Sequence, residues 1–265
     1  MSEGYNFIAQ LAELSHTELG TPNPADPKGL EHFVTLSSMW LVAGLLVIAG
    51  LVARASLKSS PNPLTPQKTL TLRNFFELIA EFVMNMGDSA MGKENRKYLP
   101  FIVTLFTFVL FMNLLGLIPG FVMPTHRITI NAGLAITVFL CYNFWGIKEV
   151  GIVNYLKHLW GPVFFVGFLL FPIEIISHMI RPLSLSLRLF GNMTGDHMVL
   201  GVFTDLTQRL GDSTGFLYIP IPVVFYFLGT MVCCLQAYIF ALLTMIYIKL
   251  ATAHEDHGEH GAAHH

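Results

Sequence analysis

The feature that most constrains this sequence is a set of long, uncharged, apolar runs. Phe33 to Ala53 is one of them, 21 residues without a charged side chain. The hydrocarbon core of a bilayer is about 30 Å thick, and about 20 helical residues cross it with every backbone polar group satisfied internally. Comparable runs cover Leu99 to Thr125, Ile128 to Ile147 and Ser213 to Ile248. We therefore expect an all-α polytopic membrane protein.

Composition agrees with a chain that lies mostly in lipid. Of the 265 residues, 53% are hydrophobic and 12% are charged, about half the charged share of a typical soluble domain. The net charge of −2 gives no reason to expect nucleic acid as a partner. The cysteines Cys141, Cys233 and Cys234 stand in apolar runs and are expected to be small buried side chains rather than disulfides or metal ligands.

Two segments depart from the simple pattern of an apolar span. In residues 70–98 the apolar side chains recur at helical spacing and the charged ones fall largely on the other side, which predicts an amphipathic helix at the membrane interface. Residues 159–206 are apolar but carry several charged side chains. As one helix they would be about 70 Å long, so this segment is expected to tilt steeply, to bend at Pro172 or Pro182, or to be two helices.

These segments give an expected domain organisation with five membrane crossings and one interfacial helix. Prolines 119 and 124 would end the second crossing, a short Pro-Thr-His-Arg link would make it a hairpin with the third, and the last helix would begin just after Pro222. Residues 1–32 form an extracytoplasmic N-terminal segment and 253–265 a His-rich cytoplasmic tail. The membrane domain, 33–252, comprises a helix at 33–53, the interfacial helix at 70–98, a helical hairpin at 99–147 and two long, tilted helices at 159–206 and 223–250.

The orientation follows from the basic residues. Seven lysines and arginines lie in 54–97, and cytoplasmic segments are enriched in these residues. Placing this segment in the cytoplasm puts the N-terminus outside and the C-terminus inside. No internal repeat is evident, which disfavours a transporter built from inverted repeats.

Arg188 is the most informative single residue. A guanidinium deep in a membrane segment costs about 2.5–3.5 kcal/mol on insertion scales, and such residues usually face protein or a water-filled cavity. At 100° per residue, Glu174, Arg181, Ser184 and Asn192 fall within about 40° of Arg188. His197 points about 180° away and Asp196 lies between. Two polar faces at opposite ends of one helix are suited to two aqueous pockets, one open to each side.

Gln236 lies in the middle of the last apolar segment. An amide at that depth needs a partner, and a facing helix is the natural supplier. From this residue alone, a role in holding helices together is as good an interpretation as a role in transport. His178, about 80° from Arg188, is equally open to packing or to channel lining.

At this point the chain resembles a known family. The segment Arg-Pro-Leu-Ser-Leu-Ser-Leu-Arg-Leu-Phe-Gly-Asn-Met (181–193) closely resembles the signature of subunit a of the membrane sector (Fo) of F-type ATP synthase. Leu-Gln-Ala-Tyr-Ile-Phe-Ala-Leu-Leu (235–243) resembles the last helix of that family, and Phe-Met-Asn-Leu-Leu-Gly-Leu-Ile-Pro (111–119) resembles its earlier hairpin. The three segments follow in the family's order, over most of residues 30–252.

The resemblance implies a proton-translocating stator, not an enzyme by itself, in which two offset half-channels serve a ring of subunit c. Arg188 would be the essential arginine that separates them, Glu174 the acidic residue of the inner half-channel, Asn192 a channel-lining amide and Gln236 the glutamine opposite the arginine. His197, with Asp196, would serve the outer half-channel. Some family members have histidine where this chain has Gly229, so their outer relay does not transfer. Ser184 and His178 are candidate channel-lining residues.

The implied setting is a bacterial inner membrane, with the c-ring and the peripheral stalk subunit b as direct partners, the F1 head as an indirect partner, and lipid around the chain. No cofactor or metal is expected, and the ion is expected to be H⁺. Before the resemblance is considered, three other classes compete. A secondary transporter predicts repeats and a midplane substrate site, a membrane hydrolase or desaturase needs clustered metal ligands, and a structural anchor needs no polar stripe around Arg188.

Overall fold

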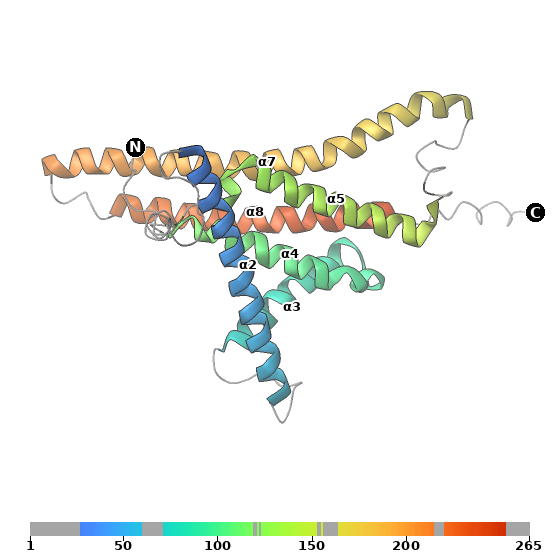
Figure 1. The fold of residues 1–265 in the computed structure, drawn as a ribbon, viewed down its shortest axis with the longest axis horizontal. Coiled ribbons are helices and arrows are strands. Elements are labelled where there is room, and N and C mark those ends of the chain that lie inside the picture. Colours follow the sequence, from blue (N-terminus) through green and yellow to red (C-terminus); the bar gives the residue numbers. More distant parts are fainter. Residues whose placement is uncertain are drawn as a thin grey trace, which may run out of the picture.

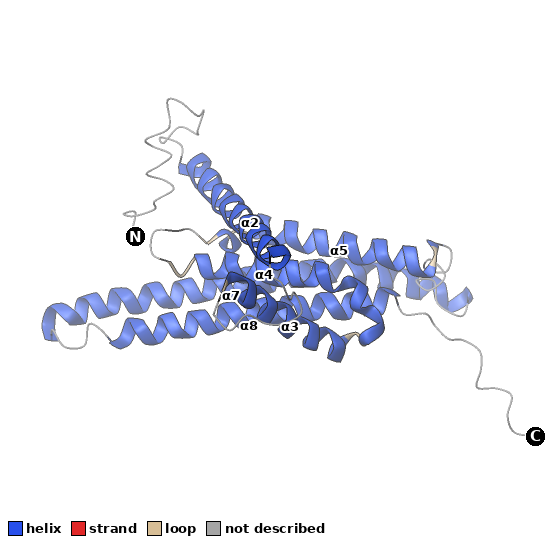
Figure 2. Cartoon of the chain, turned by 90° about the horizontal axis from the view of Figure 1, so that it is seen from below, coloured by secondary structure: helices blue, strands red, loops and turns tan. Residues whose placement is uncertain are grey.

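The computed structural model describes residues 27–59, 71–118, 121, 123–152, 155, 164–214 and 220–252. Every regular element in this part of the chain is helical (Figure 2). In chain order the elements are α2 (Pro27–Ser59), α3 (Leu72–Ala90), the 3₁₀ helix η1 (Lys93–Tyr98), α4 (Leu99–Leu115), the 3₁₀ helix η2 (Pro124–His126), α5 (Ile128–Val150), α7 (Phe164–Thr214) and α8 (Pro220–Thr252).

Four of the described helices are long and apolar enough to cross a membrane. They cover Phe33–Leu57, Lys93–Leu115, Ile128–Val150 and Tyr226–Thr252. The long helix α7, which carries Arg181 and Arg188, is not among the four. The described part of the chain is thus all-helical with four candidate spans. The fifth expected crossing, α7, is not apolar enough over a sufficient length to count as one.

The expected interfacial helix of 70–98 is two elements. α3 ends at Ala90 and η1 begins at Lys93. Between them Gly92 has φ +84° and ψ 159°, a conformation that is essentially restricted to glycine. Met91 is the last apolar side chain before Tyr98, so the apolar spacing stops at this point and the expected bounds of 70–98 ran past it.

The hairpin link is longer than the sequence suggested. α4 ends at Leu115 instead of continuing to Thr125, and α5 begins at Ile128. The link folds back tightly, because a Cβ on Gly116 would lie 2.4 Å from the Cβ of Met123. Both glycine and apolar residues occur in this link, so its composition resembles a span although it is not helical throughout.

The two long helices are continuous. α7 runs for 51 residues with Pro172 and Pro182 inside it, so it is a single helix, and it bends along its length (Figure 1). A proline inside a helix removes one backbone hydrogen bond and favours such bending. α8 begins at Pro220 rather than after Pro222, because proline is tolerated in the first turn, where the N–H has no intrahelical partner.

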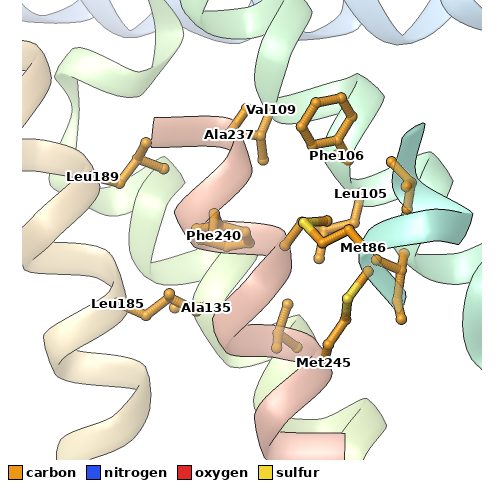
Figure 3. Packing of buried hydrophobic residues seen from close by; sticks show 14 of the residues in the cluster. Met86, Leu105, Phe106, Val109, Ala135, Leu185, Leu189, Ala237, Phe240 and Met245 are labelled. Atoms are coloured by element: carbon orange, nitrogen blue, oxygen red, sulfur yellow. The ribbon is translucent and has the colours of Figure 1, made fainter. Parts of the chain in front are cut away.

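α8 is the centre of the bundle. It packs against α3, α4, α5 and α7, and Phe240, Met245 and Ile248 are fully buried along it. Figure 3 shows side chains of α4, α5 and α7 converging on Ala237 and Phe240. Because lipid is as apolar as these side chains, their contribution comes from close packing rather than from removal of water.

Two features stand out from this bundle. α2 crosses the other helices steeply (Figure 1), and its side chains, for example Trp40 and Ile48, are largely exposed, as expected of a helix surrounded by lipid. The C-terminal part of α7 and the N-terminal part of α8 extend beyond α4 and α5 (Figures 1 and 2). The long helices therefore present a surface that the other described helices do not cover.

Polar contacts tie helix ends together at one end of the bundle. Lys97 of η1 pairs with Glu149 at the end of α5, at 2.6 Å. Lys249, at the end of α8, donates a hydrogen bond to the carbonyl oxygen of Ala90 at the end of α3, at 3.1 Å. The final turns of α3, α5 and α8 and the 3₁₀ helix before α4 therefore meet in one region.

Candidate functional site

The centre of α7 is held against the bundle by a buried stripe. Leu185, Leu189 and Met193, spaced by four residues, are fully or almost fully buried. Residues at this spacing share one face of a helix, and this face packs against α5 and α8. The stripe fixes the rotation of α7, and with it the direction of every other side chain on this part of the helix.

Arg188 lies beside the stripe, on the outward side. Its side chain is exposed, and the neighbouring outward residues Leu183 and Leu187 are 56% and 47% exposed. The next outward position, Gly191, has no atom within 4 Å of an added Cβ. A permanent positive charge therefore stands on a largely apolar surface of the isolated chain.

One helical turn after Arg188, a pair of amides joins the two long helices. Asn192 Nδ2 of α7 donates a hydrogen bond to Gln236 Oε1 of α8 at 2.6 Å. Gln236 is 1% exposed, so the structure supplies the facing-helix partner that its depth requires. The bond also fixes the amide, with its oxygen toward Asn192 and its nitrogen turned away. Gln236 Nε2 is buried with no acceptor among the described residues.

A second polar group of residues lies two to three turns earlier on α7. The ring of His178 is 6.4 Å from that of Tyr142 and 6.5 Å from that of Tyr155. The guanidinium of Arg181 lies 5.7 Å from the ring centre of Tyr247 on α8. His178 and Arg181 thus face the aromatic ends of α5 and α8, at a different level of the bundle from Arg188.

The remaining expected site residues are only partly described. Ser184 is half-buried, and Gly229 is buried. The side chains of Glu174, Asp196 and His197 lie outside the described part of the structure, although the helix that carries them is described. The structure therefore brings Asn192 to Gln236, one turn from Arg188. It does not describe the contacts of Glu174, Asp196 and His197, the residues expected in the two half-channels.

Buried polar residues that the sequence analysis did not single out lie near the start of α5. Asn113 and Asn131 are both fully buried. Asn131 Nδ2 donates to the carbonyl oxygen of Thr125 at 2.7 Å, whereas neither side-chain polar atom of Asn113 has a partner among the described residues. Each is an amide inside an apolar run, the same signal that singled out Gln236.

The described residues hold no group of three or more histidine, cysteine, aspartate or glutamate side chains placed to bind a metal ion. The His-rich stretch 253–265 lies outside them. The described polar groups near Arg188 are amides and hydroxyls.

Comparison with known proteins gives a consistent result. The family model described as ATP synthase A chain matches residues 36–249. ATP synthase subunit a of Bdellovibrio bacteriovorus is 42% identical over 224 residues, covering 84% of this chain and 92% of that protein. The subunit a of Geobacter sulfurreducens is 42% identical over 210 residues, covering 79% and 83%. ATP synthase subunit a 1 of Syntrophotalea carbinolica is 38% identical over 251 residues, covering 94% and 97%.

Proposed function

Because this chain belongs to the ATP synthase A chain family, we propose that it is the proton-conducting stator of a rotary ATP synthase. It provides two offset half-channels to a ring of subunit c, and Arg188 separates them. As a subunit a it is a membrane component of an assembly with other ATP synthase subunits. It transports ions and makes no bond itself, since ATP is formed elsewhere in the complex.

The observation that carries the proposal is the position of Arg188 on an exposed, largely apolar face of α7. A guanidinium facing lipid is costly, and it stays protonated at any accessible pH. A carboxylate on a partner that packs against this face would neutralise it. The ring of subunit c is that partner, and its carboxylates pass Arg188 one after another as the ring turns.

The physics of the cycle follows from this placement. A proton from outside neutralises a rotor carboxylate, which can then enter lipid. After nearly a full turn the carboxylate reaches the inner pocket, and the positive charge of Arg188 favours its ionised form by lowering its pKa. The same charge blocks direct passage of protons between the pockets. Each charge that crosses contributes about 2.3 kcal/mol per 100 mV, which rotation transmits to the F1 head.

We assign the other residues as follows. Asn192 and Gln236 form the polar wall beside Arg188, and their hydrogen bond of 2.6 Å supports this role. Glu174 serves the inner half-channel, with Ser184 and His178 as further lining residues. His197 and Asp196 serve the outer half-channel, since Gly229 lacks a side chain that could relay a proton.

The proposal includes a membrane arrangement. α2, α4, α5, α7 and α8 cross the bilayer, the long helices α7 and α8 are steeply tilted alongside the curved ring, and α3 lies at the interface. The N-terminal segment is outside, and the tail at 253–265 is in the cytoplasm of a bacterium. Subunit b of the peripheral stalk contacts the chain, and the surrounding lipid covers the exposed face of α2. The steep crossing of α2 over the long helices (Figure 1) supports the tilt.

ATP-driven proton pumping in inverted membrane vesicles tests the function. Arg188→Ala is expected to abolish pumping while the complex still assembles, because the rotor carboxylate then lacks its counter-ion. Gln236→Leu is expected to reduce pumping. Arg181→Ala is the matched control, since this arginine lies on the same helix but stacks on Tyr247, and it should retain most of the pumping. An assembled Arg188→Ala complex that pumps at the normal rate would show that the proposed mechanism is wrong.

A further inference from the structure

We propose that Asn131 is a positioning residue for Gln236 and the third member of a chain of amides that ends beside Arg188. The inference rests on the proposed function, in which Gln236 borders the path of the proton. It adds a residue of α5 to a site formed by α7 and α8. Helix register, burial and the unused hydrogen-bonding atoms of two amides support this role.

Contacts at the far end of the bundle fix the register of α5 against α8. The rings of Tyr142 and Tyr247 are 5.9 Å apart, and a Cβ on Gly146 would lie 2.8 Å from the carbonyl oxygen of Ala251. Both pairs are separated by 105 positions, so the two helices run parallel in one constant register. Asn131 and Gln236 are separated by the same 105 positions.

The direction of the side chains agrees with this register. Asn131 precedes Tyr142 by eleven residues, as Gln236 precedes Tyr247, and eleven residues are about three helical turns. Each amide therefore lies on the same face of its helix as the tyrosine that contacts the other helix. Between the two levels, Ala135 of α5 and Phe240 of α8 are buried in one cluster, and Figure 3 shows both beside Leu185 of α7.

The contacts of α7 place this level at Arg188. Arg181 lies over the ring of Tyr247, and Asn192 bonds to Gln236, so α7 runs antiparallel to α8. His178, whose ring lies near that of Tyr142, gives the corresponding register against α5. By that register Asn131 lies level with Leu189, the neighbour of Arg188.

The two amides have complementary atoms unused. Asn131 is 0% exposed and Gln236 is 1% exposed. Asn131 Oδ1, an acceptor, and Gln236 Nε2, a donor, have no partner among the described residues. A buried polar group without a partner is unfavourable, because it has lost its hydrogen bonds to water. One bridging water, or a rotamer change of either amide, joins the donor to the acceptor and satisfies both.

The joined amides form a directional chain. Asn131 donates to the carbonyl oxygen of Thr125 in the hairpin link and accepts from Gln236, which in turn accepts from Asn192. Each bond fixes which end of the next amide carries the donor. Asn131 therefore prevents the Gln236 amide from turning over, which would exchange donor for acceptor in the wall beside Arg188.

A double-mutant cycle in the assembled complex tests the coupling. Asn131→Leu is expected to slow ATP-driven pumping per assembled complex about three- to tenfold, the effect of one hydrogen bond. In a Gln236→Leu background it should have no further effect, because the amide that it positions is gone. Asn143→Leu is the matched control. This residue is an amide on the same helix whose Oδ1 accepts from Tyr155, and its effect should be the same in both backgrounds.

A second measurement does not depend on activity. After Cys141, Cys233 and Cys234 are replaced by serine, Asn131→Cys with Gln236→Cys should be cross-linked in membranes by a short bifunctional thiol reagent, which spans the gap that one bridging water would fill. Asn131→Cys with Leu235→Cys should not, because Leu235 is exposed on another face of α8. Absence of the first cross-link, or independent effects of Asn131→Leu and Gln236→Leu in an assembled complex, overturns the inference. An assembled Arg188→Ala complex that pumps overturns the proposed function instead, and the two failures are thereby distinguished.

Discussion

At the scale of single residues, the site combines one exposed charge with a buried amide. Arg188 is exposed, whereas Gln236 beside it is almost fully buried. The charge is placed where a partner can reach it, and the Gln236 amide is placed where only the chain itself can satisfy it. This difference separates the residue proposed to act on the rotor from the residues that shape its surroundings.

The Asn192–Gln236 bond should contribute measurably to stability. Asn192→Leu removes the donor and leaves Gln236 Oε1 buried without a partner, which should lower the free energy of unfolding by about 1–3 kcal/mol. Thermal unfolding of the purified chain in detergent measures the change. Thr230→Val is the control, because Thr230 is exposed and its hydroxyl bonds only to the carbonyl oxygen of Tyr226 in its own helix. Equal melting temperatures of Asn192→Leu and the parent chain would contradict the prediction.

The loss of thermal stability at acidic pH should depend on Asp88. Arg96 donates two hydrogen bonds to this carboxylate, at 2.9 and 2.6 Å, and together with its positive charge they hold the pKa of Asp88 below its ordinary value. A folded-state pKa below the unfolded value of about 3.9 stabilises the fold above that pH, and this stabilisation is lost as pH falls through the folded-state pKa. Asp88→Asn should therefore flatten the decline of the melting temperature below about pH 4.

The Asp88 effect should be small and should decrease with salt, because exposed pairs are well screened. Glu94→Gln serves as its control, since Glu94 is exposed and forms no salt bridge within the described residues. If Asp88→Asn leaves the pH dependence of the melting temperature unchanged at low salt, the pair does not stabilise the fold.

At the scale of helices, sequence reasoning located the elements better than their ends. The uncharged runs correctly placed α2, α4, α5 and α8, because a run of apolar residues is a strong signal for a helix in lipid. The end of α4 was missed because residues 116–118 are as apolar as the helix before them. The break at Gly92 was missed because the expected helix was extended to Tyr98, although residues 92–97 contain no apolar side chain.

The arrangement of the helices was not available from the sequence. Nothing in the apolar runs indicates that α8 lies at the centre of the bundle. The sequence analysis found Gln236 from its depth, and the partner Asn192 became identifiable only from the packing of α7 on α8. Asn131 carries the same signal as Gln236, but its relation to the site depends on a register that only the contacts between helices define.

Close approach of α5 and α8 should be sensitive to one methyl group. Gly146→Ala would place a Cβ 2.8 Å from the backbone oxygen of Ala251 and 3.0 Å from the ring of Tyr155. The helices must then separate, at a cost of about 1–3 kcal/mol, visible as a lower melting temperature and a smaller yield of assembled complex. Gly133→Ala on the same helix meets no atom within 4 Å and should leave stability equal or higher, because alanine is the better helix former. Equal stability of both variants would contradict the packing described.

At the scale of the whole molecule, the contacts constrain how often the chain passes through the bundle. α5 and α8 run parallel, and their C-terminal ends meet near Glu149 and Lys249. α7 connects the end of α5 to the start of α8, so it must travel the length of the bundle in the opposite direction. α7 is too polar to meet the criteria for a candidate span, but it runs along the length of the bundle as α5 and α8 do.

The number of crossings determines on which side of the membrane Lys249 lies. If only the four apolar helices crossed, both ends of the chain would lie on the same side. A crossing by α7 makes the number of crossings odd and puts Lys249 on the same side of the membrane as Glu94 of η1. Single cysteines replacing Glu94, Lys249 and His126, all exposed, can be labelled with an impermeant maleimide in a chain without native cysteines. Glu94→Cys and Lys249→Cys should react only from the cytoplasmic side, where basic residues are enriched, and His126→Cys only from the outside. Labelling of Lys249→Cys from the same side as His126→Cys would exclude α7 as a crossing, and with it the outer half-channel assigned to this helix.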